Sequence, residues 1–263
     1  MNQVHSAQML AGQVAMVTGA SSGLGAHFAR LLARHGAAVA VAARRVDRVQ
    51  ALADEITAGG GQALALSLDV ADAHAIAPAL DDVEAKLGPL GIMVNNAGVG
   101  GEGLALDLSI EELDNIFDVN LRAVYIGARE AARRMIASGR GEREEARIIN
   151  IASVAAYTVL PGLSAYCVSK AGVAMMTKAM AREWARRGIA VNALLPGYIE
   201  TEINADWFAT EAGQKQVKGF PRRRLMDIAG LDEAFLLLAG PGARAITGSL
   251  ITVDDGQALA GGG

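Results

Sequence analysis

The sequence predicts an α/β fold in which a doubly wound parallel sheet of about seven strands carries helices on both faces. Short apolar runs alternate with helical stretches of ten or more residues, which is typical of βαβ units. Of the 263 residues, 52% are hydrophobic but only 4% are aromatic, so Ala, Val, Leu and Ile must build the core. The 31 glycines fit close packing of helices on a sheet and argue against a disordered or fibrous chain.

The elements are expected where short apolar runs indicate strands and longer amphipathic stretches indicate helices. The predicted strands are 14–18, 38–42, 63–68, 92–94, 147–151, 190–195 and 250–253. The helices that follow them in turn are 23–35, 45–57, 73–87, a long region over 110–138, 164–187 and 231–239. Right-handed crossovers would place these helices on both faces of the sheet.

Two segments interrupt this alternation. Residues 138–145 are polar and charged, and they predict an exposed loop. Trp207 and Phe208 stand among polar residues, and this region, about 199–225, is interpreted as a lid over a substrate or as a surface helix with an apolar face. No Pro/Ser-rich linker divides the chain, so we expect one domain over residues 1–263.

Composition and charge exclude several classes of function. A net charge of −4 argues against nonspecific nucleic-acid binding. Cys167 is the single cysteine, so no intrachain disulfide can form, which fits a reducing, cytoplasmic compartment. No apolar run reaches the ~18–20 residues that span a bilayer, and the first ten residues lack a signal-peptide pattern. Because His27, His35 and His74 show no ligand spacing with Cys, Asp or Glu, we expect no metal.

A glycine-rich segment follows the first strand and opens the first helix. Glycine allows backbone to approach a ligand closely, and a helix start offers N–H groups and a positive dipole end to a pyrophosphate. In a βαβ context the pattern indicates a dinucleotide site. The residues assigned to it are Gly19, Ser21, Ser22, Gly23, Leu24 and Gly25. A tight turn without a ligand is the alternative.

The end of the second strand indicates which nicotinamide cofactor is used. NAD sites usually place an acid there to accept from the ribose 2′-hydroxyl, but the nearest acid is Asp47, inside the next helix. Arg44 and Arg45 would instead hold a 2′-phosphate, with Arg44 as the main contact and Ser22 adding a hydroxyl. We therefore expect NADP(H). The alternative is that the two arginines are only the solvated, basic start of a helix, which would give the same sequence pattern.

Further polar residues follow the third and fourth strands. Asp69 would accept from the adenine amino group, and Asn96, Ala97 and Gly98 come directly after the fourth strand. Open α/β sheets bind ligands at the carboxyl ends of their strands. We therefore expect these residues in the cofactor site.

Tyr166 and Lys170 are four residues apart on a predicted helix, so they share one face. A nearby ammonium would lower the phenol pKa toward working pH, where acid/base catalysis is most effective. Lys170 would also bind the nicotinamide ribose, and Ser153, at the end of the preceding strand, would polarise a substrate oxygen. Asn120 would hold a water that connects Lys170 to solvent. Taken singly, each residue also fits an ordinary structural role.

The ordered set of motifs resembles the short-chain dehydrogenase/reductase family over nearly the whole chain. The motifs are Thr18-Gly-Ala-Ser-Ser-Gly-Leu-Gly25, Asn95-Asn-Ala-Gly98, Asn120, Ser153, Tyr166-Cys-Val-Ser-Lys170 and Pro196-Gly197-Tyr-Ile-Glu-Thr201. The resemblance implies a seven-stranded Rossmann-like sheet, an Asn–Ser–Tyr–Lys tetrad, 4-pro-S hydride transfer and a homotetramer. It also implies cofactor contacts for Pro196 and Gly197, nicotinamide contacts for Ile199 and Thr201, and an adenine-side contact for Val70. The strand end at Arg44-Arg45 is similar to that of NADP(H)-preferring members.

The sequence departs from the family pattern in two places. The usual Asp-Gly-Gly after the last strand reads Asp254-Asp255-Gly256. Met226 and Ile228 stand where many members have Gly and Pro. Both places lie near the expected substrate edge or subunit interface.

The expected reaction interconverts a ketone and a secondary alcohol. The candidate substrate residues are Val154, Leu160, Tyr198, Trp207 and Phe208, which would suit a hydrophobic or aryl ketone. A 3-oxoacyl-thioester reductase is the first alternative, with Arg129, Arg133 and Arg134 facing an acidic carrier protein. A non-catalytic NADP(H)-binding sensor is the second, and epimerisation or dehydration on the same fold is a further one. Cys167 is expected to be a packed thiol.

Overall fold

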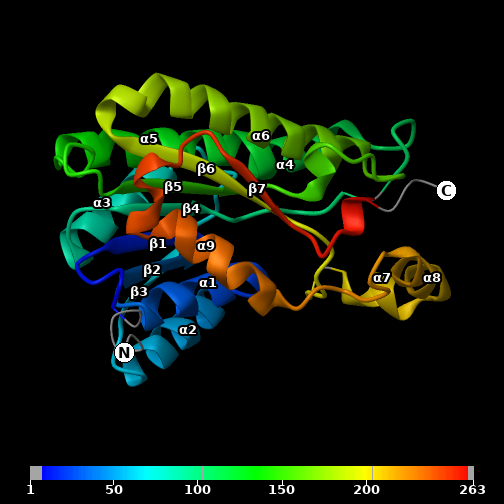
Figure 1. The fold of residues 1–263 in the computed structure, drawn as a ribbon, viewed down its shortest axis with the longest axis horizontal. Coiled ribbons are helices and arrows are strands. Elements are labelled where there is room, and N and C mark those ends of the chain that lie inside the picture. Colours follow the sequence, from blue (N-terminus) through cyan, green and yellow to red (C-terminus); the bar gives the residue numbers. More distant parts are fainter. Residues whose placement is uncertain (1–7, 102, 203, 260–263) are drawn as a thin grey trace.

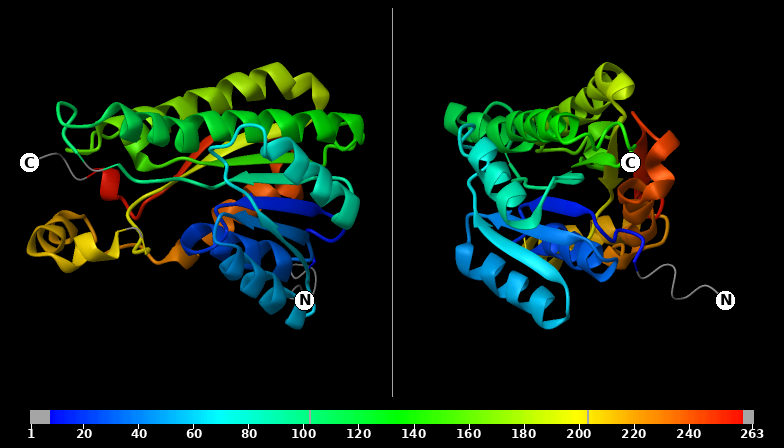
Figure 2. Two further views of the ribbon diagram at one scale, coloured as in Figure 1. Left: turned by 180° about the vertical axis from the view of Figure 1, so that it is seen from behind. Right: turned by 90° about the vertical axis from the view of Figure 1, so that its left-hand side faces the viewer.

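The structure is a computed structural model that describes residues 8–101, 103–202 and 204–259. Its seven strands form one parallel sheet in the order β3-β2-β1-β4-β5-β6-β7. The chain winds outward from β1 to β3, returns to β4 beside β1, and winds outward again to β7. Helices therefore cover both faces of the sheet, as Figures 1 and 2 show. The predicted fold class is confirmed.

All seven predicted strands are present, with ends within one residue of the predicted ones. They are β1 Val14–Thr18, β2 Ala38–Ala43, β3 Gln62–Ser67, β4 Ile92–Asn95, β5 Ala146–Ile151, β6 Ile189–Pro196 and β7 Leu250–Val253. The central strands β1, β4, β5 and β6 are buried along their whole length. They are mostly apolar because helices cover both sides of them, and the polar side chains that they carry, such as Asn150 and Asn192, are buried as well.

The helices differ from the prediction mainly in the middle of the chain. They are α1 Gly23–Arg34, α2 Val46–Ala58, α3 Ile76–Leu87, α4 Ile110–Phe117, α5 Ala123–Ala137, α6 Ser164–Trp184, α7 Ala205–Ala209, α8 Glu211–Gly219 and α9 Asp232–Ala239. The region predicted as one long helix is α4 and α5 joined by a π-helical turn, Asp118–Arg122. Such turns are rare and occur often at functional sites.

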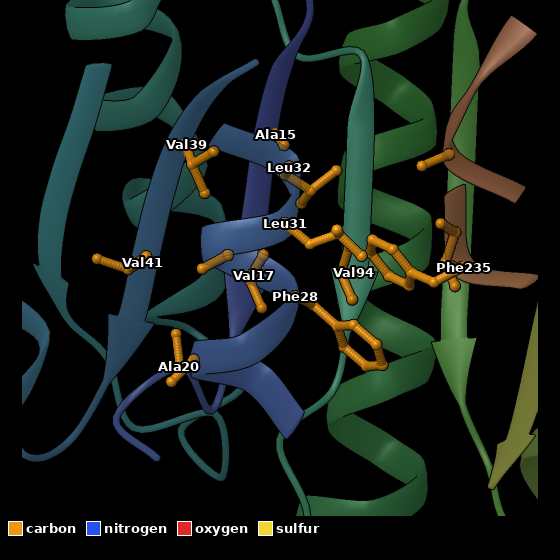
Figure 3. Packing of buried hydrophobic residues seen from close by; sticks show 14 of the residues in the cluster. Ala15, Val17, Ala20, Phe28, Leu31, Leu32, Val39, Val41, Val94 and Phe235 are labelled. Carbon is orange, nitrogen blue, oxygen red and sulfur yellow. The ribbon is translucent and has the colours of Figure 1, made fainter. Parts of the chain in front are cut away.

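Each face of the sheet has its own apolar core. Helices α1, α2 and α9 cover one face, where the rings of Phe28 and Phe235 stack with their centroids 4.1 Å apart (Figure 3). Helices α3, α5 and α6 cover the other face, with Leu80, Met135 and Val173 among its fully buried side chains. Small alanines on the strands let these helices approach closely, which explains how a core with few aromatic residues is filled.

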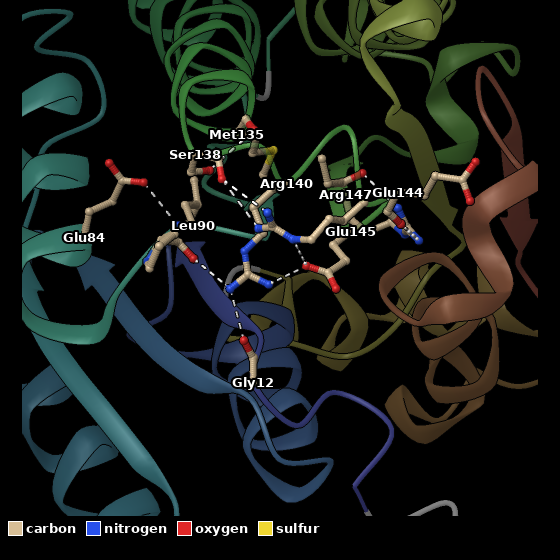
Figure 4. Close-up of polar contacts among 12 residues, drawn as sticks. Gly12, Glu84, Leu90, Met135, Ser138, Arg140, Glu144, Glu145 and Arg147 are labelled. Carbon is tan, nitrogen blue, oxygen red and sulfur yellow. Dashed lines mark hydrogen bonds and ion pairs between the residues drawn. The ribbon is translucent and has the colours of Figure 1, made fainter.

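Arginines close the end of the sheet where the strands begin. Arg140 is 9% exposed, and it donates to the carbonyl oxygens of Gly12 and Pro89 and to the Glu145 carboxylate. Arg147, near the start of β5, donates to the carbonyl oxygens of residues 144, 146 and 240. Figure 4 shows both side chains turned into the protein. The prediction of an exposed loop over 138–145 is therefore wrong at Arg140 and Gly141, which are buried.

The segment between β6 and α9 contains two short helices, α7 and α8, within the region that the sequence analysis interpreted as a lid or as a surface helix with an apolar face. In Figures 1 and 2 they project beyond the end of the sheet at which β6 finishes. Thr210 caps α8 by accepting from the Gly213 N–H.

Candidate active site

The glycine-rich loop between β1 and α1 packs against the end of β4. Gly19 and Gly23 have φ of +66° and +52°, which glycine adopts without strain. A Cβ on Gly19 would lie 2.7 Å from the Ala97 Cα, so no side chain fits there. The Asn96 side chain donates to the carbonyl oxygens of Thr18 and Gly19, and the Thr18 hydroxyl accepts from the Asn96 and Ala97 N–H groups. Asn96 and Ala97, which follow β4, thus brace the loop.

Helix α1 begins without a side-chain cap. Ser22 precedes the helix in an extended conformation, and its hydroxyl makes no capping hydrogen bond. The hydroxyls of Ser21 and Ser22 instead accept from the Arg45 guanidinium, at 2.9 Å and 2.6 Å. The first backbone N–H groups of α1 are therefore not taken up by the side chain best placed to cap them, which suits an anion-binding helix start.

Arg45, rather than Arg44, lies in this cluster. Its guanidinium also contacts the carboxylate of Glu202, which comes from the segment after β6. Arg48, one turn further along α2, binds the same carboxylate at 2.8 Å. Arg44 is exposed. The sequence analysis ranked Arg44 ahead of Arg45 as the phosphate contact, whereas in the structure it is the Arg45 guanidinium that meets the Ser21 and Ser22 hydroxyls.

The residues predicted on the adenine side follow β3. Asp69 is exposed, and its carboxylate accepts from the Ala71 N–H at 3.0 Å, so it already stabilises a turn. Val70 and Ala97 are among the side chains that line a small cavity beside β1 and β4. Both residues lie at the carboxyl end of the sheet, as expected.

Asn120 and Lys170 lie on two sides of Gly98. A Cβ on Gly98 would lie 3.4 Å from Asn120 Oδ1 and 3.6 Å from Lys170 Nζ. Asn120 is fully buried in the π-helical turn, and its amide group exchanges two hydrogen bonds with the Val99 backbone and donates a third to the Ser169 hydroxyl. The turn is what directs Asn120 inward.

Ser153 and Tyr166 come from the end of β5 and the first turn of α6. Ser153 begins a short 3₁₀ turn, and its hydroxyl accepts from the Ala155 N–H at 3.1 Å. Its hydrogen bond with the Tyr166 hydroxyl lowers the phenol pKa, although burial is the larger effect and raises it. Lys170 Nζ lies 5.6 Å from the centre of the Tyr166 ring. The structure thus gathers Asn120, Ser153, Tyr166 and Lys170 at one point.

The expected effect of Lys170 on Tyr166 is corrected by this geometry. Lys170 is 4% exposed and donates to the Ile151 carbonyl oxygen at 3.0 Å, and desolvation lowers its pKa to about 8. The Tyr166 pKa is raised by burial, and the groups that act on it besides Ser153 are Cys167 and Tyr198. The prediction that the ammonium dominates the phenol pKa is therefore wrong for this structure, because desolvation outweighs a cation that faces a carbonyl.

The side chains predicted for the substrate divide into two groups. Tyr198 packs against Phe208 edge to face and stacks on Phe220, with centroid distances of 6.0 Å and 5.2 Å. Trp207 is 43% exposed and donates to Gln216, whose side chain also hydrogen-bonds to Tyr198. These aromatic residues join α7 and α8 to the segment after β6.

The other group lies on the opposite side of the site. A mostly apolar hollow of about 330 Å³ lies between residues 103–105 and 159–164. Leu160 and Cys167 line it, so the thiol that was expected to be packed is half-buried at its wall. Val154 is buried.

The segment after β6 is held by the C-terminal part of the chain. Gly197 leaves space for Gln257, whose amide oxygen accepts from the Tyr198 N–H at 2.6 Å. Ile199 is buried, and a Cβ on Gly23 would lie 3.7 Å from the Thr201 side chain. The Pro196–Thr201 motif therefore lies against the glycine-rich loop, as the cofactor prediction requires.

The departure at Asp255 has a structural explanation. Asp255 has φ +57°, a left-handed conformation that glycine adopts more readily. Its carboxylate binds Arg222 and Arg224 at 2.8 Å and 2.9 Å, which ties the end of the chain to the segment after α8. The ion pairs offset the conformational cost.

Sequence reasoning missed Arg48, Glu202 and Gln257. Arg48 sits on the exposed face of α2, Glu202 follows the Thr201 motif, and Gln257 lies beyond the last strand. Only Gln257 left a signal, since an amide after the last strand can satisfy backbone groups of a neighbouring loop. The other two depend on an ion pair between residues 154 positions apart.

Comparison with known proteins assigns the family. The sequence pattern of the short chain dehydrogenases matches residues 13–212. The chain belongs to this family. It is 33% identical to a gluconate 5-dehydrogenase of Gluconobacter oxydans, over 94% of this chain and 95% of that protein. It is 35% identical to a 3-oxoacyl-(acyl-carrier-protein) reductase of Staphylococcus aureus, covering 92% and 97%.

A solved structure extends the comparison to the fold. The structure of a protein from Beutenbergia cavernae, determined with NADP bound at low occupancy, superimposes with a TM-score of 0.87. It is 35% identical, and the match covers 94% of this chain and 97% of that one. The chain is thus an oxidoreductase of the alcohol/ketone class that uses a nicotinamide cofactor.

Two structural findings accompany this assignment. Within residues 8–101, 103–202 and 204–259, no helix combines the length and apolar character needed to cross a membrane. Over the same residues, no group of His, Cys, Asp and Glu side chains is arranged to hold a metal ion.

Proposed function

We propose that this protein is an NADP(H)-dependent oxidoreductase that interconverts a hydrophobic or aryl ketone and its secondary alcohol. The observation that supports the proposal is that Ser153, Tyr166 and Lys170 come together at the end of β5, with Lys170 close to Gly98. Gly98 follows Asn96 and Ala97, which brace the glycine-rich loop, so the proposed proton donor would lie near the proposed cofactor-binding loop.

The residues present fit the cofactor. The glycine-rich loop permits close backbone approach, and the start of α1 offers N–H groups that the Ser22 side chain does not cap. Arg45, with Ser21 and Ser22, would bind the 2′-phosphate through charge-assisted hydrogen bonds. Ile199 and Thr201 would hold the nicotinamide carboxamide.

Each chemical residue has one task in the proposed reaction. A nicotinamide held by these residues would supply a hydride to the carbonyl carbon in reduction and accept one from the alcohol carbon in oxidation. Tyr166 donates its proton to the developing alkoxide in reduction and takes it back in oxidation. Ser153 donates a hydrogen bond to the same oxygen, and Lys170, with a pKa lowered to about 8, exchanges a proton at its ammonium near neutral pH. Asn120 holds the Val99 backbone in place and donates to the hydroxyl of Ser169, the residue before Lys170.

Burial raises the Tyr166 pKa, so the phenol is protonated at neutral pH, which is the form that reduction needs. Oxidation needs the phenolate, and its rate should therefore rise as the pH rises.

The substrate class follows from the side chains around this point. Tyr198 is among the groups that raise the Tyr166 pKa, which supports a position for Tyr198 near the reacting oxygen, and Leu160 lines the apolar hollow. We propose that α7 and α8, through Trp207 and Phe208, form the lid over the substrate. An apolar ketone would then lie between the lid and the hollow.

The thioester alternative finds less support. Arg129 and Arg133 bind the carboxylate of Glu130, and Arg134 binds Glu130 and Asp81. Their charges are largely matched within the protein, which leaves a weaker positive field for an acidic carrier.

We also propose a homotetramer. Large apolar side chains are exposed on α4, α5 and α6, among them Ile110, Tyr125 and Met175. Light scattering coupled to gel filtration would test this; a monomer at micromolar concentration would contradict it.

The function is tested by following nicotinamide absorbance with purified protein and a panel of ketones that includes aryl, aliphatic, sugar-derived and 3-oxoacyl thioester substrates. We expect turnover of aryl or aliphatic ketones, with kcat/KM at least about tenfold higher for NADPH than for NADH. Turnover confined to sugar-derived or thioester substrates would reject the proposed substrate class. Tight NADPH binding without turnover of any carbonyl would favour a sensor.

A further inference from the structure

Glu202 ties the segment after β6 to the start of α2. Both of its carboxylate oxygens lie 2.8 Å from Arg48 Nη1, and one lies 3.2 Å from Arg45 Nη1. Thr201, the preceding residue, lies against Gly23 of the glycine-rich loop. The ion pairs therefore connect the segment that leads to the proposed lid with the side of the site that holds the glycine-rich loop.

The same guanidinium group serves two sets of acceptors. Arg45 donates to the hydroxyls of Ser21 and Ser22 while it contacts Glu202. A phosphate on the cofactor ribose would need these donors, since it too is an anion with several acceptor oxygens. The carboxylate and the phosphate would repel each other at this distance, so both cannot keep full use of Arg45 and Arg48.

We propose that Glu202 is a specificity-determining residue that competes with the 2′-phosphate of NADP(H) for Arg45 and Arg48. The proposal rests on the proposed function, in which Arg45 binds that phosphate. Bound NADP(H) displaces the carboxylate, whereas NAD(H), which has a hydroxyl at this position, leaves the ion pairs in place. Glu202 thereby makes the preference for NADP(H) smaller than the two arginines alone would produce.

The charge and exposure of the group fit such a role. Arg48 and Arg45 hold the Glu202 pKa below its usual value, so the carboxylate is ionised at neutral pH. The side chains of Arg45, Arg48 and Glu202 are 44%, 44% and 56% exposed. Exposed ion pairs are weak and screened by salt, so a phosphate can displace Glu202 at a cost of a few fold in affinity.

The test compares Glu202→Gln with Glu200→Gln. Both remove one negative charge from exposed positions of the same segment, but Glu202 makes the ion pairs with Arg45 and Arg48. Dissociation constants for NADPH and NADH are measured by calorimetry without substrate. We expect Glu202→Gln to bind NADPH about three- to tenfold more tightly and NADH within about twofold of wild type. Glu200→Gln should stay within about twofold for both cofactors, and the Glu202→Gln effect should shrink in about 0.5 M salt.

Three results would overturn the proposal. Unchanged NADPH affinity in Glu202→Gln would show that the carboxylate does not compete. An equal gain in NADPH affinity in Glu200→Gln would show that the effect comes from the charge of the segment and not from the ion pairs of Glu202. Weaker NADH binding in Glu202→Gln would instead make Glu202 an acceptor for the ribose hydroxyl.

Arg45→Ala separates this proposal from the one on which it rests. If that variant weakens NADPH far more than NADH while Glu202→Gln has no effect, the phosphate site stands and the competition is rejected. If Arg45→Ala weakens both cofactors equally, the phosphate site itself fails, and the competition fails with it.

Discussion

Arg147 and Lys170 are both buried cations, and they lie at opposite ends of strand β5. Each is 4% exposed, and burial lowers the pKa of both. Arg147 donates to three carbonyl oxygens near the start of the strand, whereas Lys170 donates to one, that of Ile151 at its end.

The two ends of β5 show how the desolvation of a cation can serve two purposes. A guanidinium has so high an intrinsic pKa that it stays charged after desolvation, so Arg147 acts as a permanent clamp on backbone groups. An ammonium desolvated to a pKa of about 8 can lose its proton near neutral pH. Arg147, at the structural end of the sheet, therefore keeps its proton, whereas Lys170, at the chemical end, can exchange its proton.

The largest effect is expected at the chemical end. Tyr166→Phe removes the proton donor and should lower kcat/KM by about 10²–10⁴-fold. NADPH affinity by calorimetry should stay within about twofold of wild type, because the ring remains. Full activity in this variant would remove Tyr166 from the mechanism.

Arg147→Met tests the structural end. The change leaves three carbonyl oxygens without their donor, so the free energy of unfolding should fall by about 2–4 kcal/mol. Urea denaturation measures this change. The kcat/KM of the remaining folded protein should match wild type. A loss of activity without a loss of stability would show that Arg147 also affects the chemistry at the other end of the strand.

Lys170→Met should shift stability in the opposite direction. Below pH 8 the wild-type folded state must hold a buried ammonium, so replacing it should raise the unfolding free energy at pH 7 by about 1–3 kcal/mol while activity is lost.

The pH dependence of the unfolding free energy gives an independent check on the direction of the Lys170 pKa shift. Between a folded pKa of about 8 and the unfolded value of 10.5, the unfolded chain binds more protons at Lys170. Its contribution should therefore make wild-type stability rise with pH over that window, and the rise should be absent in Lys170→Met. Identical slopes in the two proteins would show that the ammonium is not desolvated.

The smallest effect is expected for Arg140→Lys. The lysine keeps the charge beside Glu145 but cannot reach that carboxylate and the carbonyl oxygens of Gly12 and Pro89 with one planar group. We expect a loss of about 1 kcal/mol in thermal or urea unfolding and unchanged kinetics. A loss as large as that of Arg147→Met would show that the whole end of the sheet depends on guanidinium geometry.

Prediction from sequence worked best where the signal was local. The apolar runs predicted every strand, because strands covered on both faces are built mostly from apolar residues, even though β5 also carries the buried Arg147 and Asn150. The four-residue spacing of Tyr166 and Lys170 placed them on one face of α6, and the glycine-rich loop was found from its position between a strand and a helix. A π-helical turn at Asn120 could not be found this way, since it changes the period without changing the composition.

Side-chain partnership was harder to predict. Arg44 and Arg45 are neighbours in the sequence, and only the hydrogen bonds of Arg45 to Ser21 and Ser22 distinguish it. Glu202 has no sequence signal that relates it to Arg48. The Tyr166 pKa was predicted in the wrong direction because charge pairing can be read from spacing, whereas burial depends on the whole surrounding structure.

By itself, the sequence determined the layered fold and the family and singled out Tyr166 as the proposed proton donor, since periodicity and short motifs record interactions within a few residues. Tertiary structure alone decided which arginine meets Ser21 and Ser22, which carboxylate opposes it, and how far Lys170 is removed from water. These properties arise from contacts between segments far apart in the chain, where the path of the backbone sets distance and solvent exposure.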